Sequence, residues 1–138
     1  MPEFVLDHGT RETAQRFAKL DEFTQGYIEA LFFTDTGTGD DGELEHATVD
    51  DLAPSAWHKI KLICAAFQEA NQTLLDAAYA CDDYNERRAG NDLWYTENGH
   101  GVGYWDRDLG DIGDKLTDAA ERHERGFYRG DDGLLYLD

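Results

Sequence analysis

The sequence predicts an α+β fold, with about three helices packed on a small antiparallel sheet made of two β-hairpins. Three observations support this fold class. Apolar residues recur every three or four positions in long segments, which indicates helices. An Asn-Gly pair between aromatic-rich runs indicates one hairpin turn, and a Gly-Asp-Asp-Gly run near the end indicates another. The 138 residues suit a single compact domain covering residues 1–138.

The first predicted helix covers residues 11–33, after a short N-terminal arm. Thr10 or Thr13 is its candidate N-cap, because a hydroxyl can accept a hydrogen bond from a free N–H of the first turn. Gly26 lies within this segment and indicates a kink or a boundary between two helices. The apolar positions with helical spacing are Phe17, Leu20, Phe23, Tyr27, Ala30 and Leu31.

A second helix is predicted over residues 54–88, beginning at Pro54 or Ser55. Asn71 interrupts its apolar stripe and is a candidate buried polar residue. The stripe consists of Trp57, Ile60, Ile63, Cys64, Phe67, Leu74, Ala78 and Cys81.

A third helix is predicted over residues 108–126. On this segment an acid precedes a base by four residues three times, which is the favourable order for ion pairs along a helix. We therefore interpret its polar face as a solvated, ion-paired surface. The three predicted pairs are Asp111–Lys115, Asp118–Arg122 and Glu121–Arg125.

The segment DLWYTENGHGVGYWDR, residues 92–107, is predicted as the first hairpin, turning at Asn98 and Gly99. The simplest interpretation is a turn with packed aromatic residues. Alternatively, His100 is a candidate general base, and Trp94 and Trp105 are a candidate stacking platform. The residues of this candidate recognition hairpin are Trp94, Tyr95, Glu97, His100, Tyr104, Trp105 and Asp106. The second hairpin is predicted at FYRGDDGLLYLD, residues 127–138.

The net charge of −18 is large for so short a chain. It argues against direct binding to nucleic acid and to anionic membrane surfaces, which would repel the protein. Residues 34–58 hold seven acids and no lysine or arginine, so an exposed acidic loop is predicted at residues 34–53. A charged soluble surface, adaptation to high salt and mimicry of DNA all fit this acidity. The candidate partner-binding residues are Asp35, Asp40, Asp41, Glu43, Glu45, Asp50 and Asp51.

Several classes of function lack their usual sequence signals. The chain shows no P-loop, no GxGxxG and no HExxH, and its single serine, Ser55, lies at a predicted helix start. Cys64 and Cys81 have no metal-ligand spacing and are interpreted as reduced thiols. No catalytic residue, metal site or cofactor is therefore predicted. A signal peptide and a membrane span are not evident, so we expect a cytoplasmic protein.

Four stretches together resemble a family of small acidic phage and prophage proteins of unassigned activity. They are FTQGYIEALFF, CAAFQEAN, NDLWYTENGHGVGYWDR and the closing YRGDDGLLYLD, and the motif NGHGxGxWDR is the most specific. The resemblance covers most of the chain from about Phe23. It implies no catalytic residues. It implies a context in which a small acidic protein binds host machinery such as restriction or CRISPR complexes.

These observations predict a non-catalytic, phage-type acidic protein in the cytoplasm of a host cell. It would bind a basic, nucleic-acid-handling surface of a host or phage protein, with carboxylates in place of phosphates. The expected partner is a host defence nuclease or a CRISPR complex, which makes the protein a DNA-mimic-like inhibitor. Two alternatives stay open. One is a small-ligand binder or enzyme that uses the aromatic hairpin around His100, and the other is an assembly adaptor, such as a homodimer joined through sheet edges.

Overall fold

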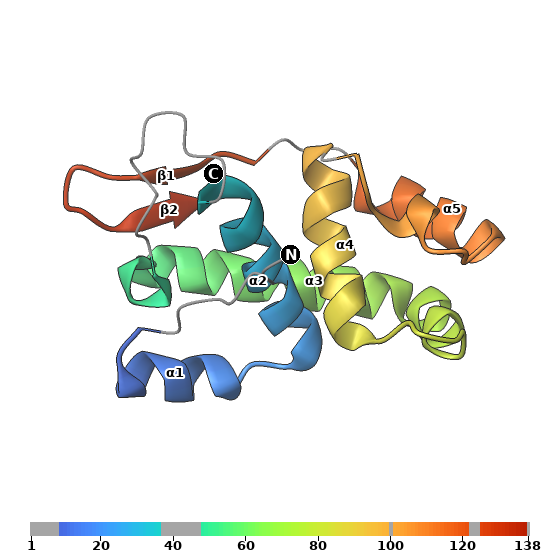
Figure 1. Cartoon of the computed structure of the whole chain (residues 1–138), viewed down its shortest axis with the longest axis horizontal. Coiled ribbons are helices and arrows are strands. Elements are labelled where there is room, and N and C mark those ends of the chain that lie inside the picture. Colours follow the sequence, from blue (N-terminus) through green and yellow to red (C-terminus); the bar gives the residue numbers. More distant parts are fainter. Residues whose placement is uncertain (1–8, 37–47, 100, 122–124, 138) are drawn as a thin grey trace, which may run out of the picture.

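The computed structural model describes residues 9–36, 48–99, 101–121 and 125–137, with the backbone alone at residues 35 and 36. Within these ranges the chain is mostly helical (Figure 1). The α-helices are α1 (Arg11–Ala18), α2 (Glu22–Thr36), α3 (Pro54–Tyr79), α4 (Glu86–Asn98) and α5 (Asp111–Ala120). Two short 3-10 helices, η1 (Val49–Asp51) and η2 (Tyr104–Asp106), precede α3 and α5, and the strands are β1 (Phe127–Arg129) and β2 (Leu135–Leu137).

The predicted fold class is wrong. The described residues form five α-helices and one two-stranded antiparallel sheet, in place of three helices on two hairpins. Only the second predicted hairpin is confirmed, over residues 127–137, with Phe127 opposite Leu137 and Arg129 opposite Leu135. This ribbon is attached to the rest of the fold because the Ala53 N–H donates to the Leu135 carbonyl at 2.9 Å.

The first hairpin is replaced by helix α4 and the loop that follows it. Asn85 caps the start of α4 by accepting a hydrogen bond from the Arg88 N–H at 2.9 Å. Gly99 ends the helix in the left-handed conformation, with φ of 65°. A left-handed glycine serves a helix C-terminus as well as a hairpin turn. The Asn98-Gly99 pair was therefore correctly predicted to change the direction of the chain, but it ends a helix and does not turn a hairpin.

The two long predicted helices are each divided in two. The break in the first lies between α1 and α2, where Asp21 accepts a hydrogen bond from the Thr24 N–H at 2.7 Å and so starts a new helix. The second ends at Tyr79, and Asp83, with φ of 63°, lies in the turn before α4. The predicted cap Thr10 is confirmed, since it accepts from the Thr13 N–H at 3.3 Å.

Gly26 does not kink α2 but lets another helix approach it. A Cβ on Gly26 would lie 2.1 Å from the Arg87 carbonyl oxygen, and a Cβ on Gly90 would lie 1.9 Å from that of Phe23. The Asn91 side chain also donates to the Gly26 carbonyl at 2.6 Å. Helices α2 and α4 therefore cross in backbone contact at this glycine pair.

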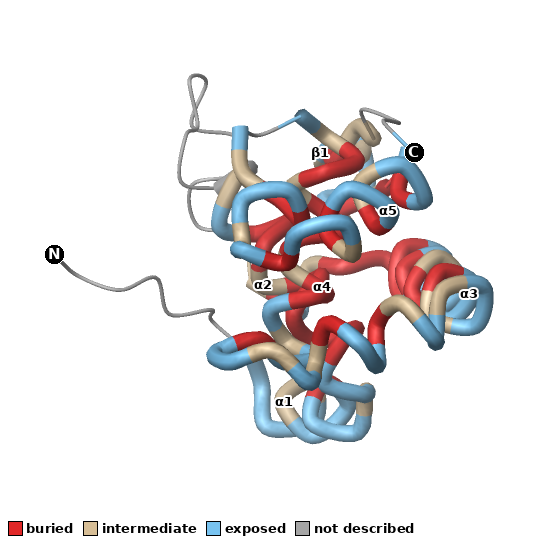
Figure 2. The backbone as a smooth tube through the Cα atoms, turned by 90° about the vertical axis from the view of Figure 1, so that its right-hand side faces the viewer, coloured by how far each residue is buried: buried red, intermediate tan, exposed pale blue. Residues whose placement is uncertain are grey.

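The crossed helices α2 and α4 form the centre of the molecule, and α3 passes alongside them (Figures 1 and 2). The side of α3 that faces them is buried and its opposite side is exposed along its length. Rings of Phe23, Phe67 and Tyr104 stack in sequence, with centroid separations of 6.0 and 5.9 Å. The β-ribbon and α5 lie at opposite ends of this core. The largest fully buried side chains include Trp94, Tyr27, Tyr104, Phe23 and Phe32.

Candidate functional site

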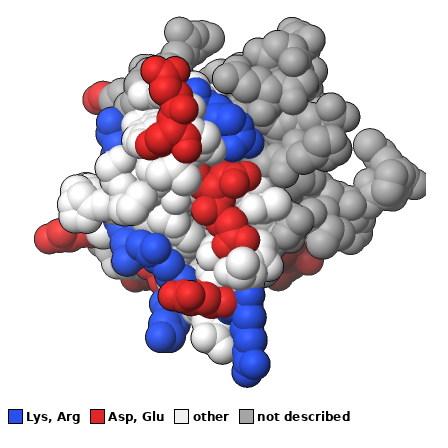
Figure 3. Space-filling view, turned by 90° about the vertical axis from the view of Figure 1, so that its left-hand side faces the viewer, with Lys and Arg blue, Asp and Glu red and all other residues white. Residues whose placement is uncertain are grey.

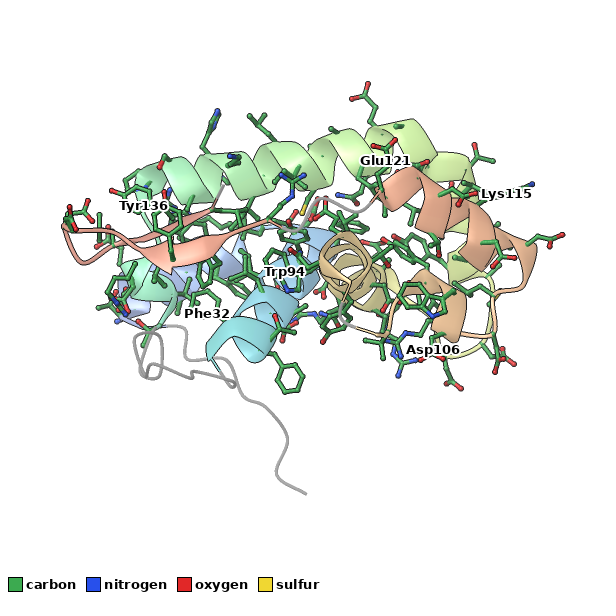
Figure 4. All side chains as sticks on the ribbon, turned by 90° about the horizontal axis from the view of Figure 1, so that it is seen from above. Phe32, Trp94, Asp106, Lys115, Glu121 and Tyr136 are labelled. Atoms are coloured by element: carbon green, nitrogen blue, oxygen red, sulfur yellow. The ribbon has the colours of Figure 1, made fainter. Side chains whose placement is uncertain are left out.

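A group of exposed carboxylates lies at the end of the molecule formed by η2 and α5. Within α5, Asp111, Asp114 and Asp118 are spaced by three and four residues and so project from one side of the helix. The opposite side is buried at Leu116 and Ala120. We call the whole group the acidic end, and all six of its members are exposed: Asp106, Asp108, Asp111, Asp114, Asp118 and Glu121. In Figure 4 Asp106 and Glu121 lie in the half of the molecule away from the β-ribbon with Tyr136, on opposite sides of the view.

Arg107, the arginine within residues 106–121, forms its ion pair with a buried carboxylate of the core and has only a weaker attraction to Asp106 of the acidic end. Arg107 donates to both oxygens of Asp92, with distances of 2.8 to 3.1 Å. The Asp92 side chain has no exposed surface, and its Oδ2 also accepts from the Tyr84 hydroxyl at 2.7 Å. A buried carboxylate needs such partners because desolvation penalises its charge. The pair with Asp92 raises the pKa of Arg107, which stays protonated.

A second buried carboxylate forms an ion pair with Arg125, which was predicted to pair with Glu121. Glu97 is 2% exposed and accepts from Arg125 at 3.1 Å and from the Tyr27 hydroxyl at 2.9 Å. The predicted Glu121–Arg125 pair is therefore wrong. It fails also because α5 ends at Ala120, and Glu121 follows with φ of 49°.

Of the other two pairs predicted on this helix, one does not form and the other lies partly outside the described residues. Over residues 101–121, all of which are described, no ion pair within 4.0 Å joins Asp111 to Lys115. The Asp118–Arg122 pair lies outside the described residues at Arg122. Asp111 and Glu121 thus lack the bases predicted for them, while the pair of Asp118 stays a prediction. The α5 carboxylates are exposed, with Lys115 as the one exposed base between residues 106 and 121.

The residues of the candidate recognition hairpin do not form one surface. Trp94 is 1% exposed, and its indole N–H donates to the Thr34 hydroxyl at 2.7 Å. Tyr104 is fully buried and donates to the Ala89 carbonyl at 2.7 Å, and burial raises its pKa well above the ordinary value. Trp105 is 45% exposed, whereas Trp94 is in the core, so the two rings do not form a shared stacking platform on the surface.

The remaining hairpin residues are distributed between core and surface. Glu97 is buried, Tyr95 is half-buried and Asp106 is exposed. His100 lies outside the described residues. The geometry therefore gives no support to a ligand site that uses Trp94 and Tyr104, because both rings are part of the core.

The carboxylates predicted to bind a partner from the loop at 34–53 have different environments. Asp50 accepts from the Thr10 N–H at 2.7 Å and from its hydroxyl at 3.0 Å, which attaches α1 to η1. Hydrogen bonds from Thr13 and Thr10 lower the pKa of Asp50. Asp51 accepts from the Thr48 N–H at 3.0 Å and lies 3.7 Å from Arg129. These two acids thus support the fold. The others lie outside the described residues: Asp40, Asp41, Glu43, Glu45 and the side chain of Asp35.

The described ranges hold few groups suited to catalysis or metal binding. No cluster of three His, Cys, Asp or Glu residues there could hold a metal ion. Cys64 and Cys81 are free thiols, and burial raises the pKa of Cys64, which makes a reactive thiolate unfavourable. No helix in the described part of the chain is long and apolar enough to cross a membrane.

Comparison with models of protein families, with curated proteins and with solved structures gave no significant match to this chain. The resemblance to small phage proteins therefore stays a prediction.

Proposed function

We propose that the protein binds a basic, nucleic-acid-handling surface of another protein through its acidic end, with carboxylates in place of phosphates. One observation carries this proposal. Six exposed carboxylates lie within residues 106–121, where Lys115 is the one exposed base and Arg107 is held by the buried Asp92. A concentrated charge of one sign speeds the encounter with an oppositely charged partner and opposes the wrong partners.

The spacing of the carboxylates on α5 supports mimicry of a nucleic-acid strand. Asp111 and Asp118 are seven residue steps apart with Asp114 between them, which at 1.5 Å per step is about 10 Å of helix, or roughly one charge per 5 Å. One strand of duplex DNA carries a charge about every 3.4 Å of axis. The two densities differ by less than about twofold. A protein surface that binds phosphates could therefore contact several of these carboxylates at once.

The proposed surface consists of residues 106–121, because the side chains of five of the seven loop acids predicted to bind a partner lie outside the described residues. Asp50 and Asp51 are engaged within the fold, whereas the α5 carboxylates are exposed. The resemblance to phage proteins suggests the cytoplasm of a host cell and a defence nuclease or CRISPR complex as the partner. An inhibitor of this kind would occlude the partner's nucleic-acid site and needs no catalytic residue of its own.

The test compares two variants that change the net charge equally. In the first, Asp111, Asp114 and Asp118 become Asn, and in the second the exposed Glu12, Glu69 and Asp131 become the matching amides. Each immobilised protein is exposed to a bacterial lysate, and bound proteins are eluted with a short DNA duplex and identified by mass spectrometry. We expect nucleic-acid-binding proteins in the duplex eluate of the wild type and of the second variant, and at least a tenfold loss for the first.

Two results would contradict the proposal. If both variants retain the same proteins in the same amounts, the acidic end has no special role. If the duplex releases nothing that the protein has bound, the contact does not involve a nucleic-acid site. Binding should also weaken steeply between about 0.05 and 0.2 M salt, as for other phosphate-like contacts.

A further inference from the structure

A hollow with excess positive charge lies between α1, the start of α2 and α3. Its volume is about 370 Å³, within the range of small-molecule sites. Three cations line it, namely Arg16, Lys19 and Lys61, and the remaining lining residues are Leu20, Asp21, Thr24 and Ala65. Figure 3 shows Lys and Arg side chains on the lower part of one face, the side on which Figure 1 places α1, with Asp and Glu side chains between them.

The three cations are not used to neutralise neighbouring acids. Within the four described ranges, none of them forms an ion pair within 4.0 Å. The Arg16 guanidinium instead lies 4.5 Å from the centroid of the Trp57 ring, one turn before Lys61 on α3, which restricts its position. The chain has 30 acids and 12 Lys and Arg residues, so three unpaired cations in one hollow are a departure from its composition.

The one carboxylate in the hollow is already engaged. Asp21 accepts from the Thr24 N–H at 2.7 Å and from the Gln68 side chain at 3.2 Å, and so it caps the N-terminus of α2. Burial raises its pKa, but the hydrogen bonds from Thr24 and Gln68 outweigh this, so the pKa lies below its ordinary value. Asp21 therefore stays charged, and the lining has a formal charge of +2 from three cations and one carboxylate.

We propose that this hollow binds a small phosphorylated ligand. The phosphate would lie among Arg16, Lys19 and Lys61, because Arg offers a planar pair of donors for phosphate oxygens and Lys adds point charges. The carbon part would contact Leu20 and Ala65, which form the apolar wall. This site is separate from the acidic end and does not depend on the proposed function.

The overall charge selects a small ligand over a nucleic acid. A long polyanion would extend over the acidic surface of a protein with net charge −18 and be repelled. A small phosphate feels mainly the charges within about 8 Å, the screening length at physiological salt. The excess of cations in the hollow therefore outweighs the distant carboxylates and attracts a small phosphate.

The test is a titration of the isotopically labelled protein, followed by NMR, with inorganic phosphate and with glucose 6-phosphate. Sodium chloride at matched ionic strength is the control. We expect saturable shifts of amide signals within residues 16–24 and 61–65, with the sugar phosphate binding more tightly than phosphate alone. Shifts that do not saturate, or that equal those with chloride, would overturn the proposal.

Three variants distinguish a specific phosphate site from non-specific electrostatic attraction to the protein. Lys61→Gln should weaken binding by roughly five- to tenfold, since it removes one charge-assisted contact. Asp21→Asn keeps a good N-cap but removes the carboxylate, so it should tighten binding. Lys115→Gln makes the same charge change as Lys61→Gln on distant α5 and should have no effect. Equal weakening by the two lysine variants would refute the site, and circular dichroism confirms that each variant is folded.

Discussion

Replacing Gly90 with Ala tests the crossing of α2 and α4. The added Cβ would lie 1.9 Å from the Phe23 carbonyl oxygen, whereas ordinary contacts begin at 3.4 Å. The helices would have to separate by about 1.5 Å, and a gap of even 0.5–1 Å loses a quarter to a half of a dispersion contact. The oxygen belongs to the backbone and cannot rotate away. Such overpacking costs about 1–3 kcal/mol, occasionally more.

Helix propensity favours the substitution, so Gly90→Ala would stabilise the protein if the two helices were not in close contact. In an isolated helix, Ala is about 1 kcal/mol more favourable than Gly. A backbone overlap of this size places the cost near the upper end of the overpacking range, about 3 kcal/mol. After subtraction of the gain in helix propensity, we expect the free energy of unfolding to fall by about 2 kcal/mol. The assay is urea unfolding followed by circular dichroism. An unchanged or increased free energy would refute the close crossing.

The partner glycine provides a second measurement on the same contact. Gly26→Ala should destabilise the protein similarly, because its Cβ would lie 2.1 Å from the Arg87 carbonyl oxygen. The double variant should cost less than the sum of the single ones, since the first substitution already separates the helices. Strict additivity would mean that the two glycines do not share one contact.

Three further expectations concern the polar contacts. Arg107→Met should lower the free energy of unfolding by about 2–4 kcal/mol in urea titrations, because it leaves Asp92 buried without a cation; Lys115→Met is the control and should have little effect. Burial raises the pKa of Tyr84 and of Tyr104, so the folded state keeps their protons longer. Stability should therefore fall as the pH rises above about 10, by about 1.4 kcal/mol per pH unit for each tyrosine, and Tyr84→Phe should reduce this slope. Asp50→Ala should speed amide hydrogen exchange in α1 but not in α4, as measured by mass spectrometry.

The helical periodicity of the sequence was informative about burial but not about where helices end. Phe23, Tyr27 and Leu31 were expected on one face and are all buried. The break before α2 depended on Asp21, whose carboxylate forms a cap only when the chain turns there. A local cap of this kind competes with the continuing helix by about 1 kcal/mol, too little for a pattern of apolar residues to reveal.

The candidate site was missed for a related reason. Acid-before-base spacing predicted ion pairs on α5, but an exposed pair of this type contributes only about 0.3–0.5 kcal/mol. Leaving a buried carboxylate such as Glu97 without a partner costs several kcal/mol, so Arg125 pairs with Glu97 instead. A possible signal was the presence of Asp92 and Glu97 within an aromatic-rich segment, where acids are rarely buried without a cation.

The sequence by itself determined the apolar positions of the core, the C-terminal ribbon and the large negative charge, because composition and local spacing express these directly. Only the tertiary structure decided whether the Asn98-Gly99 pair ends a helix or turns a hairpin, since both need the same left-handed backbone. It also decided which carboxylates are free. Arg107 and Arg125 come from segments distant from their partners in sequence, and the cost of burying Asp92 and Glu97 draws them inward. Glu121 thereby lacks the base that the sequence spacing predicted for it.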